Sequence, residues 1–160
     1  MHARRTMPKI NSLLLILIIT AVFATSLSVA SGYQRDAFGY RSYKPMTSVG
    51  FYTGKVCDYV NIDHIVSLKD AYDSGAATWS TSKKQAFAND RFNHAPSCAR
   101  VNSSKGSAGP SDFLRRSRDG KGLDYEILPW CDYVNRYRAV KIKYGLSFEG
   151  NNKQLFAACQ

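Results

Sequence analysis

The stretch Asn61-Ile62-Asp63-His64-Ile65-Val66 decides how the rest of the chain is interpreted. Apolar and β-branched residues surround an Asp-His pair, and such residues favour a strand. We therefore expect a strand over residues 56–62 that ends at Asp63 and His64. A carboxylate beside an imidazole provides an oxygen ligand for a hard metal ion and a group that can take a proton near neutral pH.

Two asparagines and a lysine follow at Asn93, Asn102 and Lys105. Carboxylate and amide oxygens suit Mg²⁺ better than Zn²⁺, which prefers Cys and His ligands. A free imidazole beside such an ion can activate water. The set indicates metal-assisted phosphodiester hydrolysis, with Mg²⁺ as the expected cofactor and Mn²⁺ or Ca²⁺ as alternatives.

The order Asp-His, then Asn, then Asn-x-x-Lys resembles the HNH (His-Me finger, ββα-metal) endonucleases. The stretch from Asp63 to Gly106 is similar to the secreted bacterial branch of that family, and the resemblance continues from Tyr133 to Leu146. The last motif position is Asn102 instead of His, which preserves an oxygen ligand. The resemblance implies a ββα-metal core, made of a small β-hairpin plus a helix.

The resemblance also implies a role for each motif residue. His64 is expected to be the general base that activates water for in-line attack on the phosphate, while Asp63 and Asn102 hold the metal. Asn93 is expected to orient His64 through a hydrogen bond across the hairpin. Lys105 joins the catalytic set through a contact with a phosphate or the leaving group, and plain solvation is its alternative.

The segment that carries the two asparagines is expected to contain a strand and a loop. Residues 91–98 predict a strand that Pro96 interrupts, and residues 102–109 predict a Ser/Gly-rich loop that faces solvent. His94 follows Asn93 directly and so points to the opposite face of that strand. We therefore leave His94 out of the site.

Helices and irregular segments make up the remainder. The pattern predicts a helix from Leu68 to a stop at Ser74, one capped by Ser80, and a long one that ends at Gly145. Shorter helices are expected over 111–116 and around 155–159. The Tyr-rich residues 31–55 are expected to be irregular and to pack aromatics on the core, with stacking on unpaired bases as the alternative. The fold class is α+β, with additional helices packed around the hairpin.

The first thirty residues differ in composition from the rest. Arg4, Arg5 and Lys9 precede an apolar run, and Ser28-Val29-Ala30 matches a small-x-small cleavage signal. We expect residues 1–30 to be a signal peptide and residues 31–160 to be the HNH-type nuclease domain, which is secreted or periplasmic. The alternative is an uncleaved membrane anchor.

Charge favours a polyanionic partner. Of 22 Lys+Arg, three lie in residues 1–30, so 19 remain against 12 Asp+Glu, a net charge of +7. Nucleic acid, an acidic polysaccharide or an anionic membrane surface would fit this excess, and solubility alone is the plainer explanation. Several cations are expected to meet backbone phosphates around the asparagine segment: Arg91, Arg100, Lys105, Arg115, Arg116, Arg118 and Lys121.

Export permits disulfides, and four cysteines allow three pairings. Cys131 and Cys159 lie at the ends of two helical segments that would meet in an antiparallel pair. Hairpin register then brings Cys98 near Cys57. A zinc site is the rival use, but no Cys-x-x-Cys spacing occurs.

The expected activity is therefore a metal-dependent endonuclease that cleaves DNA, with RNA as a further candidate substrate. The chain contains no recognition module such as a zinc finger, so we expect phosphate contacts, low sequence specificity and a monomer. The alternative is a non-enzymatic, basic extracellular module that binds DNA or another polyanion.

Overall fold

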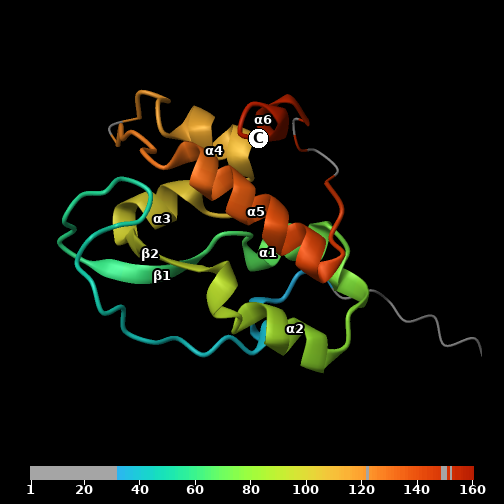
Figure 1. Cartoon of the computed structure of the whole chain (residues 1–160). Helices are drawn as coiled ribbons and strands as arrows, with labels where there is room; N and C mark the ends of the chain where they lie inside the picture. The colour runs from blue at the N-terminus through green and yellow to red at the C-terminus, as the bar shows by residue number, and fades with distance from the viewer. Residues whose placement is uncertain (1–31, 122, 149–150, 152) are drawn as a thin grey trace, which may run out of the picture. The chain divides into compact units, whose positions relative to one another are not determined.

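The computed structural model describes residues 32–121, 123–148, 151 and 153–160. The expected signal peptide, residues 1–30, lies outside these residues. No helix within the described part is both long and apolar enough to span a membrane. The elements follow in the order η1 (Arg35–Phe38), β1 (Val60–His64), α1 (Leu68–Asp73), η2 (Ala76–Thr78), α2 (Thr81–Ala88), η3 (Arg91–Asn93), β2 (His94–Cys98), α3 (Ala99–Lys105), α4 (Pro110–Arg116), α5 (Trp130–Tyr144) and α6 (Lys153–Ala157) (Figure 1).

Strands β1 and β2 form a two-stranded antiparallel sheet. The register pairs Val60 with Cys98 at one end and His64 with His94 at the other. Strand β1 begins and ends later than the expected 56–62. The reason is that Val56 forms an isolated bridge with Val49 in the preceding loop, so the chain turns before it joins β2.

Strand β2 is shorter than expected but continues through its proline. Pro96 pairs with Ile62, so the strand is not broken there. Each strand of a two-stranded sheet has a free edge, where a residue without an N–H is tolerated. Residues 91–93 form the turn η3 instead of strand, because the Asp90 carboxylate accepts a hydrogen bond from the Phe92 N–H.

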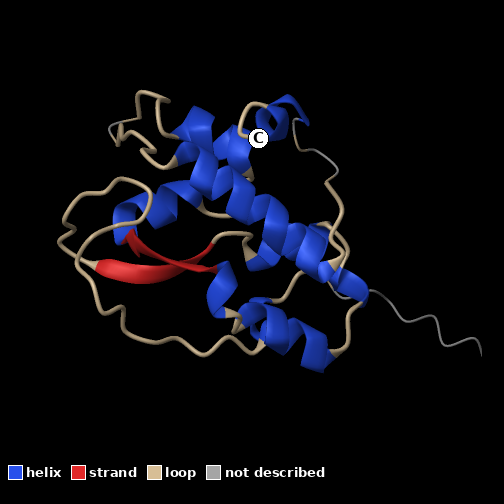
Figure 2. Ribbon diagram, viewed as in Figure 1, coloured by secondary structure: helices blue, strands red, loops and turns tan. Residues whose placement is uncertain are grey.

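Helix α3 follows β2 directly and packs against both strands. The expected loop over residues 102–109 is therefore wrong for residues 102–105. Asn and Ser are weak helix formers, but tertiary packing outweighs propensity because Val101 and Lys105 are buried on the inner side of this helix. The helix ends before Gly106, whose φ is +53°. The expected hairpin-plus-helix core is thus formed by β1, β2 and α3 (Figure 2).

The predicted helix boundaries near the caps are confirmed. The Ser67 hydroxyl accepts from the Asp70 N–H at the start of α1, and the Ser80 hydroxyl accepts from the Lys83 N–H at the start of α2. Helix α5 ends at Gly145 in the left-handed conformation. These local signals predict well because capping depends only on residues within one turn.

Aromatic rings fill the core between α5 and the hairpin. Tyr52 meets Phe113 at a centroid distance of 4.9 Å and Tyr133 at 5.4 Å, both edge-on. Tyr133 and Tyr137 from α5 are fully buried, which confirms that the aromatic face of this helix is core. The 31–55 segment contributes Phe38 and Tyr52 to the same core, as expected.

Both expected disulfides are present, Cys57–Cys98 and Cys131–Cys159. The first joins the loop before β1 to the end of β2, and the second joins α5 to the residues after α6. Crosslinks of this span remove entropy from the unfolded chain. The expected disulfide-stapled α+β fold is confirmed.

Candidate active site

His64 is the last residue of β1 and lies directly opposite His94 in the ladder. The two rings meet edge-on with centroids 4.7 Å apart. The Nε2 atoms of His64 and His94 lie 2.8 Å and 2.9 Å from the same acceptor, the carbonyl oxygen of Ala88. The end of α2 therefore anchors both imidazoles.

The shared carbonyl defines the tautomer of each ring. A carbonyl oxygen has two lone pairs, so it can accept from two N–H groups, and each neutral imidazole must then carry its proton on Nε2. The Nδ1 of His94 accepts from the Tyr43 hydroxyl at 3.2 Å. No described residue donates a hydrogen bond to the Nδ1 of His64. This nitrogen is therefore the acceptor position of the neutral ring, and His64 lines the pocket described below.

Burial keeps His64 uncharged. His64 is 4% exposed, and desolvation lowers its pKa to about 3, with smaller lowering contributions from His94 and Lys105. Burial lowers the pKa of His94 in the same direction. The His64 ring is therefore neutral at neutral pH, and burial makes it a weaker base than a solvated histidine, whose pKa lies at about 6.5.

Asp63 stands beside His64 on the opposite face of β1 and lies in a buried polar cluster. Its Oδ2 accepts from the Tyr52 hydroxyl at 2.6 Å and pairs with the Lys105 ammonium at 2.9 Å. No described residue is hydrogen-bonded to its Oδ1, and Asp63 lines the pocket described below. One oxygen of this carboxylate thus remains available to a ligand.

Lys105 is fully buried and does not face solvent. Its Nζ donates to the backbone carbonyl of His64 at 2.8 Å and pairs with Asp63. The expected contact of Lys105 with a phosphate does not fit this position. The lysine instead ties α3 to the end of β1 and so positions the Asp-His pair.

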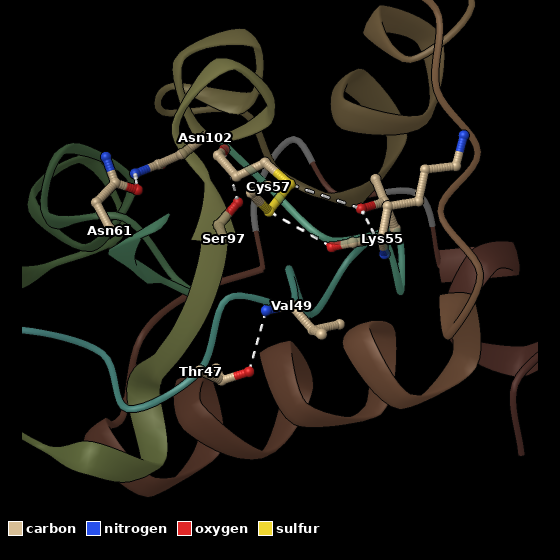
Figure 3. The surroundings of a disulfide bond; sticks show 9 residues. Thr47, Val49, Lys55, Cys57, Asn61, Ser97 and Asn102 are labelled. Carbon is tan, nitrogen blue, oxygen red and sulfur yellow. Dashed lines mark hydrogen bonds between the residues drawn. A yellow bond between two sulfur atoms is a disulfide. The ribbon is translucent and has the colours of Figure 1, made fainter. Parts of the chain in front are cut away.

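Asn102 lies on α3 with its side chain turned toward β1. Its Nδ2 donates to the Oδ1 of Asn61 at 2.8 Å, and the two amides point toward one another close to the Cys57–Cys98 disulfide (Figure 3). This bond uses the nitrogen of Asn102, and no described residue is hydrogen-bonded to its Oδ1. Asn102 can therefore offer an oxygen ligand, as the sequence suggested.

Asn93 has a different partner from the one expected. Its Oδ1 accepts from the Val66 N–H at 2.8 Å and its Nδ2 donates to the Val66 carbonyl at 3.1 Å. Its own carbonyl accepts from the Ile65 N–H. Asn93 does not reach the His64 ring, because it extends the ladder past β1 and holds the backbone that follows His64.

A pocket of about 430 Å³ brings three of the five predicted residues together, Asp63, His64 and Asn102. Asn93 and Lys105 do not line this pocket, but their side chains are hydrogen-bonded to the backbone of Val66 and His64, respectively. Among the described residues no group of three or more His, Cys, Asp and Glu could hold a metal ion. One carboxylate oxygen and one amide oxygen fit a hydrated Mg²⁺, which keeps several waters and binds through few protein ligands. The nearby Lys105 charge would weaken such binding.

The cations expected around the asparagine segment have varied partners. Arg116 donates to the carbonyls of Ser104 and Lys105 and so caps α3. Arg91 lies over the Tyr43 ring. The cations that line the pocket are instead Arg35 from η1 and Lys69 from α1.

Sequence reasoning missed His94 and Arg35. His94 was excluded because neighbours in a strand alternate in direction, but the residue to compare was its ladder partner, His64. The expected hairpin placed Asn93 opposite His64, and the observed register differs by one residue. Arg35 lies in an irregular segment without periodicity, so no local signal marked it.

Comparison with known proteins adds one relative. No family model matches the chain, and no solved structure matches it. An uncharacterized secreted protein of Arthroderma benhamiae is 36% identical over 96 residues, which is 59% of this chain. The chain spans 43% of the length of that relative.

Proposed function

We propose that residues 31–160 form a metal-dependent HNH-type endonuclease that hydrolyses phosphodiester bonds of DNA, and of RNA as a second substrate class, with little sequence preference. The observation that carries the proposal is that His64, Asp63 and Asn102 line one pocket, although they come from a strand and from the helix that follows the hairpin. A base, a carboxylate and an amide oxygen in one pocket are the groups that phosphodiester hydrolysis uses.

His64 would act as the general base. Its Nδ1 takes a proton from water, and the resulting hydroxide oxygen attacks the phosphorus as the bond to the leaving oxygen breaks. The Ala88 carbonyl then stabilises the imidazolium by accepting from Nε2. A divalent cation held by Asp63 and Asn102 would supply positive charge opposite the charge that develops on the phosphate oxygens.

Positive charge supports a polyanionic substrate. The net charge of +7 on residues 31–160 attracts nucleic acid, and Arg35 and Lys69 border the pocket where a scissile phosphate would lie. Phosphate contacts carry no sequence information, which accounts for the proposed low specificity.

We place this activity outside the cytoplasm. Residues 1–30 have the composition of a signal peptide, two disulfides staple the fold, and a relative is described as secreted. Disulfides persist mainly in oxidising compartments, which supports a secreted or periplasmic protein.

One observation favours a second function, a non-enzymatic module that binds DNA or another polyanion. Lys105 already neutralises the Asp63 carboxylate, so this acid has less charge to offer a metal ion. A binding module would need the cations but would have no use for a free imidazole nitrogen at the pocket surface.

Plasmid nicking separates the two functions. The purified chain is incubated with supercoiled plasmid and Mg²⁺, Mn²⁺, Ca²⁺ or EDTA, and His64→Ala purified in parallel controls for contaminating nucleases. We expect nicking with a divalent ion and none with EDTA. Plasmid that is bound but stays supercoiled under every ion would establish the binding module, and cleavage that persists in EDTA would refute the metal requirement.

A further inference from the structure

A second hollow, which we call the tyrosine groove, opens along the outer side of β1. It has a volume of about 700 Å³ and its lining includes Tyr40, Tyr43, Lys44, Asp58, Tyr59 and Ile62. The segment from η1 runs past the sheet to the far end of β1 before the chain turns back into the strand (Figure 1). The groove therefore lies between β1 and the segment that precedes it.

The tyrosine groove meets the candidate active site. Ile62 lines both the groove and the pocket that contains His64. The Tyr40 ring, on the groove side, meets the His64 ring edge-on at a centroid distance of 4.7 Å. Tyr43 is linked to the site as well, because its hydroxyl donates to His94. The groove and the pocket therefore adjoin at Ile62, and Tyr40 of the groove contacts His64.

The lining suits nucleobases better than phosphates. Its charged side chains are Lys44 and Asp58, which have opposite signs and offer no net attraction to a row of phosphates. Its exposed ring is Tyr59, which is 70% exposed and so can stack on a base, whereas the Arg91 guanidinium already covers one face of Tyr43. Aromatic rings bind any unpaired base through its π-face. In a duplex these faces are already stacked on neighbouring bases.

We infer that the tyrosine groove binds the unpaired bases of a single-stranded nucleic acid and feeds that strand to His64. This inference rests on the proposed function, since it is the junction with the candidate catalytic pocket that assigns the groove to a nucleic acid. It makes single strands the preferred substrate class of the site.

Equilibrium binding tests the inference without any cleavage. Fluorescence anisotropy in EDTA compares three labelled probes of equal length: an oligothymidylate, an abasic strand with the same phosphates, and a duplex. The variants are Tyr59→Ala, Tyr59→Phe, and Ile142→Ala as a control at a 61% exposed position on α5. Tyr59 is exposed enough that its substitution leaves the core intact.

We expect the wild type to bind the oligothymidylate about 5- to 100-fold more tightly than the abasic strand. Tyr59→Ala should reduce that preference while its affinity for the abasic strand stays the same, and Tyr59→Phe and Ile142→Ala should behave like the wild type. Equal affinity for the oligothymidylate and the abasic strand, tighter binding of the duplex, or an unchanged preference in Tyr59→Ala would each overturn the inference.

Plasmid nicking keeps this result separate from the proposed function. If the protein nicks plasmid but binds both single strands equally, the inference about the groove is wrong and the proposed hydrolase stands. A chain that prefers the oligothymidylate through Tyr59 but never cleaves would support the groove as a binding site and refute the hydrolase.

Discussion

His64 and His94 face each other across the last rung of the β1–β2 ladder and donate to one carbonyl oxygen, that of Ala88. The second ring nitrogen, Nδ1, has a different environment in each histidine. The Nδ1 of His94 accepts from Tyr43, whereas no described residue donates to the Nδ1 of His64, a residue that lines the pocket. Only one imidazole of the pair can therefore take a proton from water in the pocket.

The first prediction follows from this asymmetry. His64→Ala should lower plasmid nicking by about 10²- to 10⁴-fold, the usual contribution of a general base. His94→Ala should lower it less, because that ring only supports His64. Initial nicking rates measure both effects, with circular dichroism and DNA affinity as controls for folding and binding. A His64→Ala variant as active as the wild type would exclude the assigned base.

The second prediction concerns the oxygen ligand on α3. Asn102→Ala should raise the Mg²⁺ concentration needed for half-maximal nicking, because the variant loses the amide oxygen that borders the pocket. Asn102→Asp should lower that concentration, because a carboxylate adds negative charge at the same place. Mg²⁺ titrations of the nicking rate distinguish the variants. The same half-maximal concentration in all three proteins would mean that Asn102 holds no metal.

The third prediction concerns the buried pair of Lys105 and Asp63. Lys105→Met leaves the carboxylate without its cation, and loss of one partner of a buried pair costs about 3 to 5 kcal/mol of unfolding free energy. Lys69→Met is the matched control, since its partner Asp73 is exposed and such pairs contribute about 0 to 1 kcal/mol. Urea unfolding measures both. If Lys105→Met bound DNA more weakly at unchanged stability, Lys105 would contact a phosphate, as the sequence predicted.

The fourth prediction uses an unsatisfied hydroxyl. Among the described residues, the Tyr133 hydroxyl is the buried side-chain polar atom that has no hydrogen-bond partner. Tyr133→Phe should raise the unfolding free energy by about 1 to 3 kcal/mol, because the folded state no longer buries an unpaired group. Tyr52→Phe should lower it, since that hydroxyl donates to Asp63. Urea unfolding midpoints measure both changes. If Tyr133→Phe were less stable than the wild type, the Tyr133 hydroxyl would have a hydrogen-bond partner after all.

The fifth prediction concerns pH. The His64 pKa is about 3 in the folded protein and about 6.5 in the unfolded chain. Between these values the unfolded chain binds a proton that the folded protein does not, so stability is present above about pH 6.5 and is lost as pH falls toward 3. Urea midpoints in EDTA at several pH values should show a steeper loss in the wild type than in His64→Gln. Parallel slopes would show that His64 is not buried in a neutral form.

Local signals in the sequence determined much of this protein. The cap at Ser80, the stop at Gly145 and the apolar face of α5 depend on residues within a turn or two, so they could be predicted without a structure. The antiparallel hairpin expected from these two segments also predicted the approach of Cys57 to Cys98. The Asp63-His64 pair and Asn102 were identified by type and spacing, and the structure brings them to one pocket.

Tertiary structure decided what each of these residues touches. Residues 102–105 became helical because packing on the sheet outweighed weak propensity, and this buried Lys105 against Asp63 instead of exposing it to a phosphate. Asn93 bonds to Val66 and His94 joins His64 because the ladder register sets the partners, and register depends on pairing between distant segments. The sequence thus determined which chemical groups are present, and long-range packing determined their protonation, their exposure and their neighbours.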